Sequence, residues 1–276
     1  MPARALIAVL MAGLFSQPAP KSATFLSDHL LVTWYGNPRS TLMGILGEQS
    51  GAARAAALKA QAAAYVPHTS KKVAMAYHLV AVVATCTEGA DKMWRRRETA
   101  EVIQALLDEA RANGFRLILD IQPGRSTIAD EVEALIPFLS EPDVDLALDP
   151  EFAVGGCEVP GRQIGELEAA EVNGAIARLE LLLKERRLPP KVLIVHQFRN
   201  DMLPDKVKIR DSDVVDVVLV MDGFGSQTLK KSTYREVMRR PLAFAGIKLF
   251  YRQDTNLFTP AQVLGLKPTP ALVIYQ

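Results

Sequence analysis

Two carboxylic acids stand close together in residues 146–152, which read LALDPEF. Asp149 and Glu151 are two positions apart, and residues i and i+2 of a strand point to the same side. If the apolar run before them is a strand, both carboxyl groups face one site at its end. Like charges held close push the two proton affinities apart, so that one acid can donate a proton while the other stays ionised. This pattern predicts general acid–base chemistry of the kind that cleaves a glycosidic bond.

Other polar and aromatic residues follow further apolar runs. Asp120 lies near the end of the run 116–121, and we expect it to be a third catalytic acid beside Asp149 and Glu151. Aromatic rings stack on the apolar faces of sugars and amides bond sugar hydroxyls, so the remaining residues of this kind are candidates for substrate binding. They are Trp34, Tyr35, Tyr77, His78, Gln122, His196, Gln197, Asp222 and Tyr251. For any single aromatic residue, ordinary core packing is the alternative.

The same acids and histidines are also of the types that bind divalent metal ions. The sequence contains no H-E-x-x-H or H-x-H spacing, which such sites often show. A histidine at a strand end is also commonly a packed or hydrogen-bonded residue. We therefore expect carboxylate chemistry without a metal or other cofactor, and a metal-dependent hydrolase or isomerase is the alternative.

Eight short apolar runs are predicted to be the strands that position these residues. They cover residues 30–35, 73–83, 116–121, 144–149, 192–197, 214–222, 246–251 and 271–275. Stretches with helical period separate them, at residues 50–66, 99–113, 127–139, 166–187, 232–240 and 260–264. Residues 198–212 lack a clear period, so we expect a short helix there or none.

Alternating strands and helices without a linker predict an α/β fold with one domain, a (β/α)8 TIM barrel over residues 24–276 whose chain ends after the eighth strand. An open doubly wound sheet is the alternative, although no G-x-G-x-x-G or P-loop motif follows any predicted strand. In (β/α)8 barrels the reacting groups lie at the C-terminal ends of the strands. The polar residues named above fall at those ends.

Two short segments resemble glycoside hydrolases with (β/α)8 barrels. The segment Leu148-Asp149-Pro150-Glu151 resembles the strand-four D-x-E motif of the chitinase-like and the family 25 lysozyme-like groups. The segment Ala76-Tyr77-His78 is similar to the strand-borne Y-H of the lysozyme-like group, and together the two cover under a tenth of the chain. The resemblance implies Glu151 as the proton donor, with Asp149 or Asp120 beside it.

The N-terminus predicts a secretory signal peptide over residues 1–23. Arg4 precedes the apolar stretch 5–15, which is too short to span a membrane. The mature protein is then secreted, periplasmic or on the cell surface, with no stable membrane span after cleavage. The alternative is an apolar first helix of a cytosolic protein. The 32 basic and 31 acidic residues nearly balance, so we expect no nucleic-acid partner.

Two smaller features complete the predictions. Arg95, Arg96 and Arg97 form the densest basic cluster, which we interpret as the solvated first turn of a helix. Cys86 and Cys157 follow the second and fourth predicted strands, and an exported chain could join them in a disulfide. Two unpaired thiols are the alternative, because cysteine is often buried without a partner.

Taken together, these patterns predict an exported hydrolase that cleaves cell-wall or extracellular polysaccharide by carboxylate acid–base chemistry. Because a fold does not fix a function, a non-catalytic barrel that binds glycan or a partner remains a second hypothesis. The metal-dependent barrel is the third.

Overall fold

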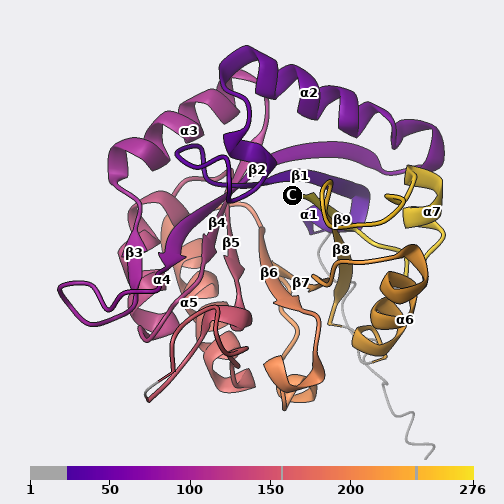
Figure 1. The fold of residues 1–276 in the computed structure, drawn as a ribbon. Helices are drawn as coiled ribbons and strands as arrows, with labels where there is room; N and C mark the ends of the chain where they lie inside the picture. The colour runs from indigo at the N-terminus through magenta and orange to yellow at the C-terminus, as the bar shows by residue number, and fades with distance from the viewer. Residues whose placement is uncertain (1–23, 157, 240–241) are drawn as a thin grey trace, which may run out of the picture.

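Eight parallel strands of the described chain close into a barrel in the computed structural model, which describes residues 24–156, 158–239 and 242–276 (Figure 1). β1 pairs with both β2 and β9, and this double pairing closes the sheet. The predicted signal peptide, residues 1–23, lies outside the described residues. The barrel strands are β1 (His29–Gly36), β2 (Lys72–Ala84), β4 (Arg116–Ile121), β5 (Val144–Leu148), β6 (Lys191–Gln197), β7 (Val215–Met221), β8 (Phe244–Leu249) and β9 (Leu272–Tyr275).

Helices follow most of the strands and cover the outside of the barrel, which confirms the predicted TIM-barrel architecture (Figure 1). They are α2 (Gly51–Ala63), α3 (Ala100–Ala112), α4 (Ile128–Leu139), α5 (Ala169–Arg186), α6 (Gln227–Val237) and α7 (Pro260–Leu264). The connection from β6 to β7 contains only the 3-10 turns η4 (Asn200–Met202) and η5 (Lys206–Lys208) among its described residues, as its weak periodicity predicts. In the described part of the chain, no helix is both long and apolar enough to cross a membrane.

Helix α6 begins at Gln227 rather than at the predicted residue 232. The side chain of Ser226 caps it by accepting a hydrogen bond from the backbone N–H of Leu229 at 3.3 Å. Such a cap satisfies one of the free N–H groups of the first turn, so the helix can begin before its apolar period does.

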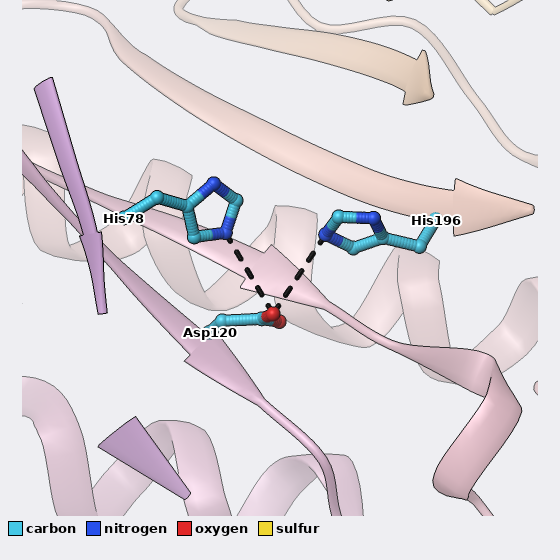
Figure 2. A group of neighbouring side chains, drawn as sticks. All are labelled: His78, Asp120 and His196. Atoms are coloured by element: carbon cyan, nitrogen blue, oxygen red, sulfur yellow. Dashed lines mark ion pairs between the residues drawn. The ribbon is translucent and has the colours of Figure 1, made fainter. Parts of the chain in front are cut away.

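Side chains alternate between the barrel interior and the layer of helices. On β1, Tyr35 packs with the interior cluster of apolar side chains, whereas its neighbour Trp34 belongs to the larger core beneath the helices. On β2, Tyr77 likewise lies in the outer core, and His78 points inward. His78, Asp120 of β4 and His196 of β6 meet inside the barrel, and all three are fully buried (Figure 2).

The short helix α1 (Phe25–Asp28) packs against the N-terminal end of the barrel. Leu26 is fully buried among the interior side chains, and its backbone N–H donates to Asp216 Oδ2 of β7 at 2.7 Å. Beside it, Arg116 of β4 donates two hydrogen bonds, of 2.6 and 2.8 Å, to the buried carboxylate of Asp145. These contacts close the lower end of the barrel, so the C-terminal end is the open one.

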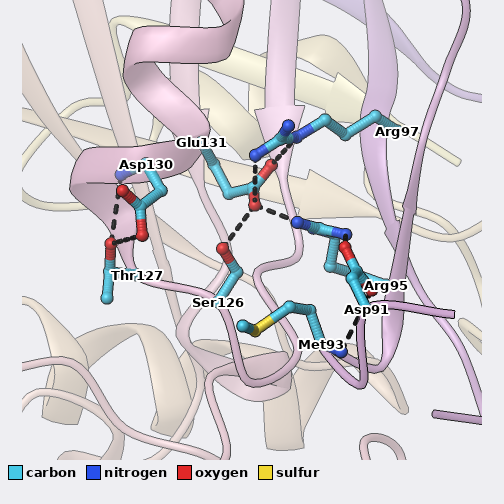
Figure 3. A network of polar contacts seen from close by, with 8 residues as sticks. All are labelled: Asp91, Met93, Arg95, Arg97, Ser126, Thr127, Asp130 and Glu131. Atoms are coloured by element: carbon cyan, nitrogen blue, oxygen red, sulfur yellow. Dashed lines mark hydrogen bonds and ion pairs between the residues drawn. The ribbon is translucent and has the colours of Figure 1, made fainter. Parts of the chain in front are cut away.

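The arginine run forms a strand, β3 (Arg95–Arg97), that pairs antiparallel with the end of β2, so its interpretation as a helical turn is wrong. Arg95 and Arg97 point to one side of β3, where both donate to the fully buried carboxylate of Glu131 on α4, at 2.8 and 2.6 Å from their Nε atoms (Figure 3). Arg96 points to the other side and lies 3.0 Å from Glu98. Alternation along a strand therefore explains the run better than a helical turn does, since it places two cations on one buried anion.

A glycine fixes the loop from β4 to α4 against this strand. Gly124 has a φ of +61°, and a Cβ atom there would lie 2.5 Å from the carbonyl oxygens of Met93 and Trp94. The next residue, Arg125, donates its backbone N–H to the Met93 oxygen at 2.8 Å. Only glycine fits this close approach without strain. The contact holds the loop that carries Gln122 at the mouth of the barrel.

Glu131→Gln should destabilise the fold by about 3 kcal/mol, because it leaves two arginines against a neutral partner in a buried site. The matched control is Glu133→Gln on the same helix, where an exposed carboxylate pairs with Arg178. That change should cost less than about 1 kcal/mol. Urea unfolding followed by circular dichroism measures both, and equal effects would contradict the importance assigned to the buried pair.

Candidate functional site

A pocket of about 650 Å³ opens at the C-terminal end of the barrel. We call it the mouth pocket. Its polar lining includes Gln122, Asp149, Glu151, Asp222 and Lys248. Its aromatic walls are formed by Tyr35, Phe152, Phe198, Phe224 and Phe250. The mouth pocket therefore combines carboxyl groups with apolar rings, the composition expected of a small-molecule or sugar site.

Asp149 and Glu151 both line the mouth pocket, but not because they lie on one strand. β5 ends at Leu148, and Pro150 begins the 3-10 turn η3 (Pro150–Phe152). Asp149 caps this turn: its Oδ1 accepts a hydrogen bond from the backbone N–H of Glu151 at 3.2 Å. Proline lacks an N–H group and fixes φ near −65°, so it ends the strand and starts the turn. The predicted pair is thus brought together by a capped turn.

Burial and neighbouring charge favour the neutral forms of both acids. Burial raises the pKa of Asp149 well above its ordinary value, and the negative charges of Asp120 and Asp222 raise it further, against the opposing effect of His196. The half-buried Glu151 also has a raised pKa, because of burial and then the charge of Asp222. The mouth pocket therefore holds carboxyl groups that keep their protons to higher pH than free side chains do.

Asp222 is held differently, by a buried lysine that sequence reasoning missed. Lys248 on β8 is 3% exposed, and its Nζ lies 3.2 Å from Asp222 Oδ2 and 3.6 Å from the centre of the Tyr35 ring. Burial raises the pKa of Asp222, but the charges of Lys248 and His196 outweigh it and lower the pKa overall. A charged residue within the predicted apolar strand 246–251 was the available signal, because lysine is seldom fully buried without a partner.

His78, Asp120 and His196 form a cluster, the His–Asp–His cluster (Figure 2). It lies below the mouth pocket and is not part of its lining. The Nε2 atom of each histidine is 3.7 Å from Asp120 Oδ2. Burial lowers the pKa of His78 to about 4. For His196, burial acts in the same direction, but Asp222, with Oδ2 3.0 Å from Nδ1, raises the pKa above its ordinary value.

Of the residues predicted to bind substrate, Tyr35, Gln122 and Asp222 line the mouth pocket. Gln122 donates from Nε2 to the Tyr35 hydroxyl at 3.3 Å, and its Oε1 accepts from the backbone N–H of Ala84 at 3.2 Å. These contacts fix the amide and the phenol as one polar edge of the pocket.

The structure corrects the placement of Trp34 and Tyr77, which were expected at the mouth. Both side chains face the helices, and the Tyr77 hydroxyl donates to Glu109 of α3 at 2.8 Å. Because strand side chains alternate, Tyr35 and His78 take the inward positions and their neighbours are turned outward. Neither Trp34 nor Tyr77 is therefore a candidate for contact with an occupant of the mouth pocket.

Gln197 and Tyr251 are also placed away from the mouth pocket. Gln197 is fully buried, and its Oε1 accepts a hydrogen bond from Lys206 Nζ at 2.8 Å. Tyr251 donates its hydroxyl to Gln61 of α2 at 2.8 Å and stacks on Tyr275. Both side chains thus join the barrel to its surrounding segments.

The predicted disulfide is not tested by the structure. Cys86 is exposed in the loop after β2 and has no disulfide partner among the residues that the structure describes. Cys157, its predicted partner, lies outside the described residues. The pairing of the two thiols stays a prediction.

The candidate site comprises an open aromatic pocket with three carboxyl groups and, below the pocket, a buried cluster of two histidines and an aspartate. Comparison with protein-family models and with curated proteins found no match for this chain.

Proposed function

We propose that the protein is a glycoside hydrolase, with Glu151 as the general acid of the reaction. The observation that carries this proposal is that Glu151 and Asp222 line one aromatic-walled pocket, Glu151 half-buried and Asp222 against a lysine. Glycosidic cleavage needs two carboxyl groups of the enzyme. One is an acid that protonates the leaving oxygen, and the other is a carboxylate that acts at the sugar ring whose bond is broken.

Glu151 suits the first role because its surroundings favour the protonated form. Burial and the nearby charge of Asp222 raise its pKa, so it retains a proton at pH values where a free glutamate has lost it. A general acid works best when its pKa is near the working pH. Asp149 acts as a positioning residue in this scheme, because it caps the turn that carries Glu151.

Asp222 suits the second role by its contacts. The carboxylate is 3.2 Å from Lys248 Nζ and 3.0 Å from His196 Nδ1, which hold it at the edge of the mouth pocket as an anion. An anion there stabilises the positive charge that develops on the sugar ring in an oxocarbenium-like transition state. This assignment replaces Asp120, which is fully buried below the pocket.

The walls of the mouth pocket suit a carbohydrate substrate. Phe152, Phe198 and Phe224 present rings that can stack on apolar sugar faces, and Gln122 and Gln253 supply amides for hydroxyl groups. The exposed Phe224 lies at the rim, where a longer chain of sugars would pass. We propose a polysaccharide of the cell wall or extracellular matrix as the substrate. Residues 24–276 would act on it as one domain after export of the protein.

Glu151→Gln should lower turnover by at least about 100-fold while the fold stays intact, because it removes the proton donor and not core packing. The assay is release of reducing ends from a panel of polysaccharides and peptidoglycan. Glu166→Gln is the matched control, since Glu166 is exposed and does not line the mouth pocket. Wild-type turnover in Glu151→Gln would remove Glu151 from the mechanism. Glycan binding by the wild type without any turnover would favour the non-catalytic barrel.

The raised pKa of Glu151 also predicts a pH-dependent stability difference that needs no substrate. The folded protein disfavours the ionised carboxylate, so the contribution of Glu151 to stability falls as the pH rises above 4.5, the ordinary value for glutamate. Glu151→Gln, which cannot ionise, should therefore be more stable than the wild type at pH 8, with a smaller difference at pH 4. Urea unfolding at both pH values measures this, with Glu166→Gln as control. A difference that is the same at pH 4 and pH 8 would contradict the raised pKa.

A further inference from the structure

We propose that His78, Asp120 and His196 bind one divalent transition-metal ion inside the barrel. The three side chains come from β2, β4 and β6 and point toward one another (Figure 2). This inference goes beyond the proposed function and does not depend on it, because none of the three residues lines the mouth pocket.

The ligand types fit such an ion. One candidate ligand atom from each residue can be chosen so that all three lie within 4.8 Å of one another. Two imidazole nitrogens with one carboxylate oxygen are typical ligands of zinc and of neighbouring first-row metals, and are less suited to calcium or magnesium, which prefer oxygen alone.

The distances within the His–Asp–His cluster fit a shared ion better than direct hydrogen bonds. Each histidine Nε2 lies 3.7 Å from Asp120 Oδ2, whereas a hydrogen bond from nitrogen to oxygen spans ~2.7–3.2 Å. Two ligands that each stand about 2.1 Å from a tetrahedral ion are about 3.4 Å apart. A small inward movement of the side chains would bring the three atoms to bonding distance.

The burial of the cluster leaves its polar atoms in need of a partner. Both ring nitrogens of His78 and of His196, and both oxygens of Asp120, are buried without a hydrogen-bond partner among the described residues. Buried polar groups are nearly always paired, and the two Nε2 atoms that face Asp120 Oδ2 call for a ligand between them. A bound ion would satisfy both histidines and the aspartate together.

A carboxylate behind one histidine completes the arrangement. Asp222 Oδ2 lies 3.0 Å from Nδ1 of His196, on the side of the ring away from Asp120. Histidines that bind metal ions commonly place their other ring nitrogen against a carboxylate, which fixes the tautomer and the ring. The Asp222 contact is an ion-pair distance on the Nδ1 side, and Nε2 is the ring nitrogen directed at Asp120 (Figure 2).

The test uses the full chain, stripped of metal with a chelator. Titration with Zn²⁺ by calorimetry should show one ion per chain, and the midpoint of thermal unfolding should rise with the free Zn²⁺ concentration. Co²⁺ in place of Zn²⁺ should give visible ligand-field absorption with nitrogen ligands. Absence of both one-to-one Zn²⁺ binding and the Co²⁺ absorption would overturn the proposal, leaving a bridging water as the occupant of the cluster.

Variants then locate the ion. His78→Gln and Asp120→Asn should each weaken Zn²⁺ binding by more than about 100-fold, because each removes a direct ligand. The matched control is His68→Gln, an exposed histidine outside the barrel, which should bind as the wild type does. Zn²⁺ binding that survives in both ligand variants would place the ion elsewhere and overturn the assignment. If a variant does not fold, X-ray absorption of the Zn²⁺-loaded wild type decides the matter, since two imidazole ligands on the ion support the assignment and a shell without imidazole overturns it.

Discussion

Closure of the parallel sheet is the constraint on which the rest of the structure depends. Because β1 bonds to β2 on one side and β9 on the other, every second side chain of each strand must enter an enclosed interior. The lower part of this interior holds apolar residues together with the ion pair of Arg116 and Asp145, and Leu26 seals it. The upper part holds His78, Asp120, His196 and Lys248, groups that are expensive to bury unless they have partners. Much of the chemistry of the protein therefore depends on the level at which polar side chains replace apolar ones in the barrel interior.

Asp222 links the two levels of this polar interior. Above, its charge raises the pKa of Glu151 in the mouth pocket; below, its carboxylate contacts His196 of the His–Asp–His cluster. Lys248 balances it from the neighbouring strand. A change in charge in the cluster is therefore felt in the mouth pocket both through Asp222 and directly, because His196 and Asp120 also act on the pKa of Asp149 in a buried site that solvent screens weakly.

Local patterns in the sequence were sufficient to predict the strands, most helices and the level at which the polar residues gather. They could not predict contacts that depend on the orientation of a side chain around the barrel. Trp34 near the end of its run and Tyr77 within the run 73–83 are predicted to face the mouth, but alternation turns both outward. The strand was predicted to run to residue 149, with Glu151 in line with it, whereas Pro150 begins a 3-10 turn that sets the position of Glu151. Lys248 was passed over because its partner, Asp222, follows a different strand and the pairing is visible only in three dimensions.

The plug at the lower end of the barrel makes the interior a cup with one opening. Leu26 occupies the bottom, and its backbone N–H is hydrogen-bonded to Asp216. Small solutes therefore reach the His–Asp–His cluster through the mouth pocket. A molecule seated in the mouth pocket would then act as a stopper. It would slow the exchange of a ligand bound at the His–Asp–His cluster without contacting that ligand. Occupancy of the mouth pocket would thus control the residence time of the ligand at the cluster.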